Sequence, residues 1–81
     1  MDRQILLQQL AQAEQSVAEG RAFIAQQQRL IVEAERDGED ATGTFRVLEK
    51  FLILQQSREQ ERARILDAIS ETIASTPPNR P

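Results

Sequence analysis

The side chains that could do chemistry in this 81-residue chain are carboxylates, arginines, hydroxyls and amides. The chain has no histidine and no cysteine, so it offers neither an imidazole base nor a thiolate, and it lacks the ligands of the usual zinc sites. The hydroxyls of Ser16, Ser57, Thr42 and Thr44 therefore have no histidine to activate them. We expect no enzyme, and no catalytic, cofactor-binding or metal-binding residues.

A cluster of carboxylates surrounds Gly38. Asp37, Glu39 and Asp40 flank this glycine, but the segment lacks the alternating ligands and the closing glutamate of an EF-hand calcium loop. A turn between two helices explains the cluster better. Gly38 suits the left-handed residue that ends one helix, and Asp40 can cap the start of the next.

A polar run without any apolar side chain extends from Gln55 to Arg62. A helix through this run presents Gln55, Glu59 and Arg62 to the surface that packs on it, opposite Gly20. Two interpretations compete: polar groups between helices fix the register and the oligomeric state, or the cluster holds a small polar ligand or a partner's side chain. We favour the first. Gly20 costs about 1 kcal/mol in mid-helix, and we interpret it as making room for Arg58 or Glu59.

Two long helices must position these residues. The segments of about 2–36 and about 41–75 are rich in Gln, Glu, Arg, Ala and Leu, which are strong helix formers, and residues 37–40 form a turn between them. All three prolines lie in the last five residues, so the second helix ends near Ser75 and residues 76–81 are predicted to be a disordered tail. The predicted fold is all-α: residues 1–75 form an antiparallel two-helix hairpin of the coiled-coil type.

Both helices carry the heptad pattern of a coiled coil, with residues of the contact surface spaced alternately three and four apart. An antiparallel pairing sets large side chains against small ones, such as Phe45 over Ala34, and it places Ile24 opposite Gln55 and Val17 opposite Arg62. The predicted seam consists of Leu6, Leu10, Ala13, Val17, Gly20, Ile24, Gln27, Ile31 and Ala34 on the first helix, and Phe45, Leu48, Leu52, Gln55, Glu59, Arg62, Leu66, Ile69 and Ile73 on the second.

Further apolar side chains flank this seam and widen the stripe beyond what two helices bury. The predicted dimer or partner face consists of Leu7, Phe23, Leu30, Val47, Phe51, Leu54 and Ile65. A chain of this length buries a low fraction of its surface. We therefore expect a homodimer in which two hairpins form a four-helix bundle, and the orientation of the two hairpins stays open.

Charge and hydropathy exclude other classes of protein. The formal net charge of -3 and the pI near 4.9 argue against nucleic acid as a partner, because phosphate binding needs a basic surface. No apolar run approaches the roughly 18 residues of a membrane span, and no basic segment precedes an apolar core at the N-terminus. We expect a cytoplasmic protein without a membrane partner.

Motifs with a distinctive spacing occupy most of the chain from Leu7 to Ile69: Val17-Ala18-Glu19-Gly20, Ile24-Ala25-x-Gln27, Ile31-Val32, Glu35-Arg36-Asp37-Gly38-x-Asp40, Leu48-Glu49-x-Phe51-x-x-Leu54-Gln55 and Arg62-x-Arg64-Ile65-Leu66. In these motifs the chain resembles a large set of short, uncharacterised helical proteins of rhizobia and related alphaproteobacteria. The resemblance implies a helical hairpin in a bacterial cytoplasm, and it implies no particular activity.

Three functions remain open at this point. The first is a non-enzymatic, self-associating helical bundle that serves as an interaction or structural module. The alternative is a small regulatory hairpin that docks a helix of a signalling protein on its exposed stripe. The third is an RNA-binding hairpin dimer with Arg21, Arg29, Arg36 and Arg58 on one face, against which the acidic charge argues. The sequence names neither the partner nor the pathway.

Overall fold

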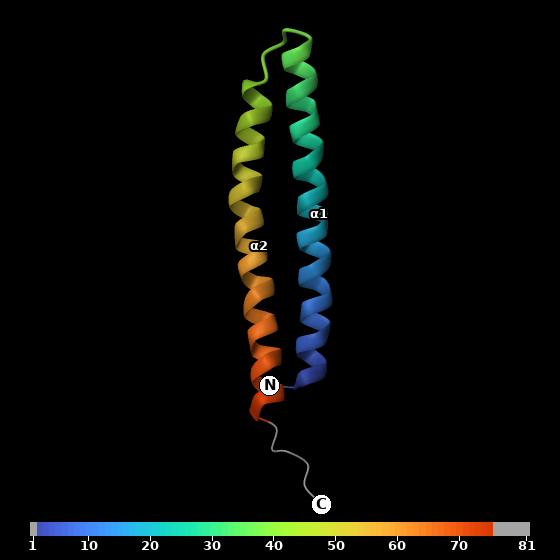
Figure 1. Ribbon diagram of the computed structural model, residues 1–81, viewed down its shortest axis with the longest axis vertical. Coiled ribbons are helices and arrows are strands. Elements are labelled where there is room, and N and C mark those ends of the chain that lie inside the picture. Colours follow the sequence, from blue (N-terminus) through green and yellow to red (C-terminus); the bar gives the residue numbers. More distant parts are fainter. Residues whose placement is uncertain (1, 76–81) are drawn as a thin grey trace, which may run out of the picture.

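A computed structural model describes residues 2–75 of the chain. Two helices, α1 (Arg3–Arg36) and α2 (Thr42–Ser75), lie antiparallel and side by side (Figure 1). Residues 2–75 contain no strand. The predicted all-α, two-helix hairpin is confirmed. The tail that we predicted to be disordered, residues 76–81, lies outside the described residues.

The turn between the helices is built on Gly38, as the sequence predicts. Gly38 has a φ of 71°, in the left-handed region that glycine enters without a steric penalty. Its N–H donates to the carbonyl of Glu35 at 3.2 Å, and the N–H of Glu39 donates to the carbonyl of Ala34 at 2.8 Å. These two bonds form a Schellman motif, which satisfies carbonyls that the helix end would otherwise leave unpaired.

Aspartate side chains cap the N-terminal ends of both helices. The Asp2 carboxylate accepts a hydrogen bond from the N–H of Gln4 at 3.0 Å. The Asp40 carboxylate accepts from the N–H of Thr42 at 2.9 Å and also from its hydroxyl. Such acceptors satisfy N–H groups that have no partner within the first helical turn. The helix α2 therefore begins at Thr42, one residue later than predicted, and Ala41 packs as a buried residue before it.

The core of the hairpin is a narrow line of side chains between the two helices. At its open end, Leu6, Ile65 and Ile69 form a buried cluster, against which half-buried Leu10, Ala13 and Ala68 pack. The buried apolar side chains of the described chain are Leu6, Val17, Ile31, Ala41, Ile65 and Ile69. So short a list is what two helices without a third layer can produce.

The contact surface of α1 is the predicted one. Every residue that we placed in the seam on this helix is buried or half-buried. On α2, one of the two predicted rows is also at the contact surface: Leu48 and Arg62 are half-buried, and Gln55 and Ile69 are buried. One half of the α2 contact surface thus follows the predicted heptad positions.

The other row of α2 lies one residue earlier than predicted. Thr44, Phe51, Arg58, Ile65 and Thr72 are half-buried or buried. The residues that we placed in that row, Phe45, Leu52, Glu59 and Ile73, are exposed, and Leu66 is half-buried. The physical reason is side-chain fit: this rotation of α2 stacks Phe51 on Phe23, with ring centroids 3.9 Å apart, and brings Ile65 into the core cluster.

Candidate functional site at the middle of the hairpin

Among the residues that the structure describes, Gln55 is the one buried polar side chain, at 6% exposure. Its Nε2 donates to the carbonyl of Val17 on α1 at 2.8 Å. Its Oε1 is buried and has no hydrogen-bond partner within the described chain. The amide therefore gains one hydrogen bond across the hairpin and leaves one acceptor unsatisfied, which costs about 1–3 kcal/mol.

Gly20 is the residue that admits this amide. A Cβ at position 20 would lie 2.7 Å from Cδ of Gln55 and 3.0 Å from Nη1 of Arg58, and it would overlap Oε1 of Gln55. Nη1 of Arg58 donates to the carbonyl of Ser16 at 3.3 Å. The prediction that Gly20 gives space to a bulky neighbour such as Arg58 agrees with this geometry. The register of the two helices, however, differs from the predicted one by about a helical turn. Gln55 contacts Val17 and Gly20, where we expected it to face Ile24.

Two ion pairs cross from α1 to α2 beside these residues. Nη2 of Arg21 lies 2.9 Å from Oε1 of Glu59, and Nη2 of Arg62 lies 3.7 Å from Oε1 of Glu14. Their side chains are between 39% and 67% exposed, so each pair contributes less than about 1 kcal/mol. We predicted Arg62 opposite Val17, and it pairs instead one turn nearer the N-terminus of α1.

The side chains of this central group contact the other helix. Gln55, Arg58, Glu59 and Arg62 are each engaged with α1, and residues 2–75 contain no group of three His, Cys, Asp or Glu side chains that could hold a metal ion. These contacts tie the two helices together at mid-length, as the structural interpretation of the polar run expects.

The predicted dimer or partner face divides in two in the structure. Leu7, Leu30, Val47 and Leu54 are 40–46% exposed. Phe23 and Phe51 stack on each other and are half-buried, and Ile65 is buried at 7%. These last three residues therefore belong to the contact surface of the hairpin.

Sequence reasoning missed an exposed apolar row on α2. Phe45, Leu52 and Ile73 are 45–55% exposed, and they share a heptad position with half-buried Leu66 and with Glu59. The heptad spacing of these residues can be seen in the sequence, but the same spacing is compatible with a row in the seam and with a row on the exposed surface. The mid-helix Gly20, which makes room for Arg58, is the signal that could have chosen between the two rotations of α2.

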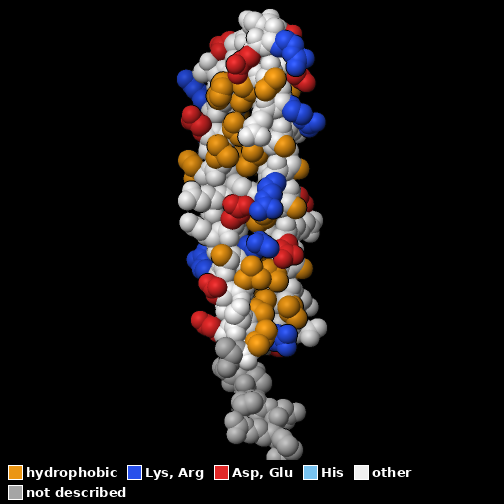
Figure 2. Space-filling model, in the orientation of Figure 1, with side chains coloured by type: hydrophobic (Ala, Val, Ile, Leu, Met, Phe, Trp, Pro, Cys, Tyr) orange, Lys and Arg blue, Asp and Glu red, His pale blue; other side chains and the backbone are white. Residues whose placement is uncertain are grey.

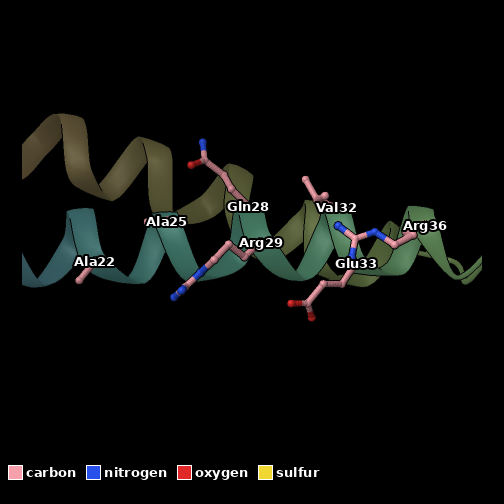
Figure 3. Close-up of a pocket in the computed structure, with 7 residues that line it drawn as sticks. All are labelled: Ala22, Ala25, Gln28, Arg29, Val32, Glu33 and Arg36. Atoms are coloured by element: carbon pink, nitrogen blue, oxygen red, sulfur yellow. The ribbon is translucent and has the colours of Figure 1, made fainter.

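The surface of α1 also has a hollow on its outer side. Its lining residues all belong to α1 and are exposed: Ala22, Ala25, Gln28, Arg29, Val32, Glu33 and Arg36 (Figure 3). Because all of its lining residues come from one helix, it is an open depression on the surface and not an enclosed ligand site.

Comparison with protein-family models, with curated proteins and with solved structures finds no match for this chain. The resemblance to short helical proteins of rhizobia thus stays a prediction. Within residues 2–75, neither helix combines the length and the apolarity that a membrane crossing requires.

Proposed function

We propose that this protein is a non-enzymatic helical hairpin that associates with a second copy into a four-helix bundle and serves as an interaction or structural module. One observation carries the proposal. The described chain buries six apolar side chains and leaves ten large apolar side chains at least 40% exposed. The exposed ones are Ile5, Leu7, Leu30, Val32, Phe45, Val47, Leu52, Ile53, Leu54 and Ile73.

Covering this surface is favourable. Full burial of a leucine or phenylalanine contributes about 1.5–3 kcal/mol, so covering a side chain that is half exposed contributes about 1 kcal/mol. Single exposed apolar residues need no explanation, but a row of them along a helix marks an interaction surface. Self-association supports the fold at the same time, because a chain of this size gains little from its own core.

The central polar group supports a module of this kind. Gln55 and Arg58 bind carbonyls of α1, and two ion pairs tie the helices together at mid-length. Polar contacts of this type fix the register of a helical pair at some cost in stability. A hairpin with a fixed register presents its exposed rows in a constant geometry to the second copy. The resemblance in the sequence leads us to place this module in a bacterial cytoplasm.

The experiment that tests the proposal is sedimentation equilibrium over a wide range of protein concentration, with helicity followed by circular dichroism. We expect a helical species of twice the 9.2 kDa chain mass. A helical monomer at every concentration would contradict self-association. That result would favour the alternative, a hairpin whose vacant stripe receives a helix of a different protein.

A further inference from the structure

One face of the hairpin carries large exposed apolar side chains near both of its ends. The Arg21–Glu59 ion pair lies on this face, and residues seven or fourteen positions from either member share it, because a heptad brings a helix back to the same side. These residues are Leu7, Glu14, Gln28 and Glu35 on α1, and Phe45, Leu52, Leu66 and Ile73 on α2. We call this surface the long face.

The long face is apolar at both ends and charged in the middle. Leu7 and Ile73, at the open end, are 46% and 55% exposed, and Phe45 and Leu52, near the turn, are 45% and 48% exposed. Between them lie the two ion pairs. Figure 2 shows a face of the molecule with this order, in which two apolar regions are separated by a band of acidic and basic side chains.

The opposite flank of the hairpin is apolar over half of its length. Leu30, Val47 and Leu54 are exposed in the half near the turn. One and two heptads beyond Leu54 and Phe23, toward the open end, the same positions hold Glu61 and Ala68 on α2, and Ser16 and Gln9 on α1. A helix or hairpin that packed there would meet only one apolar side chain, Ala68, over the remaining half. The long face, in contrast, carries large exposed apolar side chains near both of its ends, where a second hairpin can cover them.

The charges of the long face distinguish two possible orientations of a second copy. In the first, the two-fold axis runs parallel to the helices, and α1 of each copy faces α2 of the other. Arg21 then faces Glu59 of the second copy, and Glu14 faces Arg62.

In the second orientation, the axis is perpendicular to the helices, and like helices face each other. Because Arg21 and Glu59 lie near the middle of their helices, that axis would bring two Arg21 side chains together and also two Glu59 side chains. Like charges in such a contact are unfavourable.

The sizes of the side chains favour the same orientation. Beside the long face, α1 exposes small residues at heptad spacing, among them Ala11, Ala18 and Ala25. The row on α2 is bulky. When α1 of one copy faces α2 of the other, large side chains meet small ones, as close packing requires; when like helices face, large meets large and small meets small.

We propose that two copies of this chain join through the long face about a two-fold axis parallel to the helices, with α1 of each copy against α2 of the other and Arg21 opposite Glu59. The proposal rests on the self-association proposed above and adds to it the face and the orientation. In the resulting bundle both turns lie at one end, and every neighbouring pair of helices is antiparallel, which is favourable for their dipoles.

The orientation is tested by distances between spin labels on single cysteines introduced into this cysteine-free chain. Glu39→Cys places the label at the turn, and Gln60→Cys places a control label on the exposed side of the middle of α2. We expect the two turn labels within about 20–30 Å of each other, because helices of a bundle lie about 10 Å apart. The other orientation separates the turns by the length of a helix, about 50 Å for 34 residues.

The control label separates failure of the inference from failure of the proposed function. The Gln60 labels are close in either orientation, so absence of dipolar coupling there would show that no dimer forms and would overturn both proposals. Coupling at Gln60 together with a distance near 50 Å at the turn would overturn the orientation alone.

The choice of face is tested with two leucines on opposite flanks, Leu52 and Leu54, which are 48% and 43% exposed. We expect Leu52→Glu to weaken the dimer at least tenfold in sedimentation equilibrium with helicity retained, and Leu54→Glu to leave a dimer. A dimer that survives Leu52→Glu and is lost in Leu54→Glu would overturn the choice of face, while still supporting self-association.

Discussion

Gly20 and Gln55 set how closely the two helices approach at mid-length. The amide of Gln55 lies against the bare Cα of Gly20, with one hydrogen bond made to Val17 and one acceptor unsatisfied. A hydrogen bond contributes about 0.5–1.5 kcal/mol net, whereas an unsatisfied buried acceptor costs about 1–3 kcal/mol. The amide therefore adds little to stability, and its contribution is to the register of the helical pair.

At this position we predict that Gly20→Ala destabilises the hairpin. The new Cβ would overlap the Gln55 amide, and overpacking costs about 1–3 kcal/mol. The higher helix propensity of alanine offsets about 1 kcal/mol of this cost, so we expect the free energy of unfolding measured in urea to fall by about 1 kcal/mol. The amide is the end of a flexible side chain, and the loss arises because moving it breaks its bond to Val17.

Gly43→Ala is the matched control. Gly43 also lies in a helix, but a Cβ there meets nothing within 4 Å. We expect this variant to be more stable than the parent by up to about 1 kcal/mol, because only the propensity term remains. Equal effects of the two substitutions would show that the contact between Gly20 and Gln55 does not restrict the packing of the helices.

At the scale of the helix, the start of α2 depends on a charged group. The hydroxyl and the N–H of Thr42 both donate to the Asp40 carboxylate, and these bonds hold the pKa of Asp40 below its ordinary value. Bonds to the ionised form favour that form. The end of α1, in contrast, is held by backbone bonds around Gly38, which do not titrate.

We predict that the start of α2 loosens in acid. Because the folded pKa of Asp40 is depressed, its stabilising contribution is complete above the unfolded pKa and is lost as the pH falls through the folded value, below about pH 4. NMR titration of the Asp40 carboxyl in the folded protein and in urea checks this, and we expect the lower midpoint in the folded protein. Asp40→Asn retains an acceptor without the titration, so its helix start should not respond to pH in this range. Identical midpoints in the two states would contradict the assignment.

At the scale of the whole molecule, the hairpin has one line of buried side chains and two flanks that carry exposed apolar residues. The six buried apolar residues of the described part of the chain are too few to stabilise a domain strongly without further contacts. If the second copy supplies those contacts, folding and association are one equilibrium, and stability depends on the concentration of the chain.

We therefore predict that the midpoint of thermal unfolding rises with protein concentration. For a dimer that dissociates on unfolding, each tenfold increase in concentration stabilises the assembly by about 1.4 kcal/mol. Circular dichroism melts at several concentrations measure this. In the Leu52→Glu variant the midpoint at any given concentration should fall, because the weakened dimer stabilises the fold less. A constant midpoint for the parent chain would show that the hairpin folds without a second copy.

The sequence by itself determined the secondary structure, the turn and one of the two helical surfaces. Helix-forming composition, Gly38 and the flanking aspartates are local signals, and local hydrogen bonds decide where the helices begin and end. The heptad pattern of α1 is unambiguous, because polar residues occupy most of its outer positions. The residues that this spacing placed in the seam of α1 are all buried or half-buried.

The rotation of α2 was decided by the tertiary structure. Its apolar residues are spread over adjacent heptad positions, so burying Leu52 or burying Phe51 satisfies the same pattern. Contacts with α1 make the choice: Phe51 stacks on Phe23, and Arg58 passes over Gly20. Hydrophobicity measures how favourable burial is and carries no information about shape, whereas packing at crystal-like density selects one rotation. That selection leaves Phe45, Leu52 and Ile73 on the outer surface.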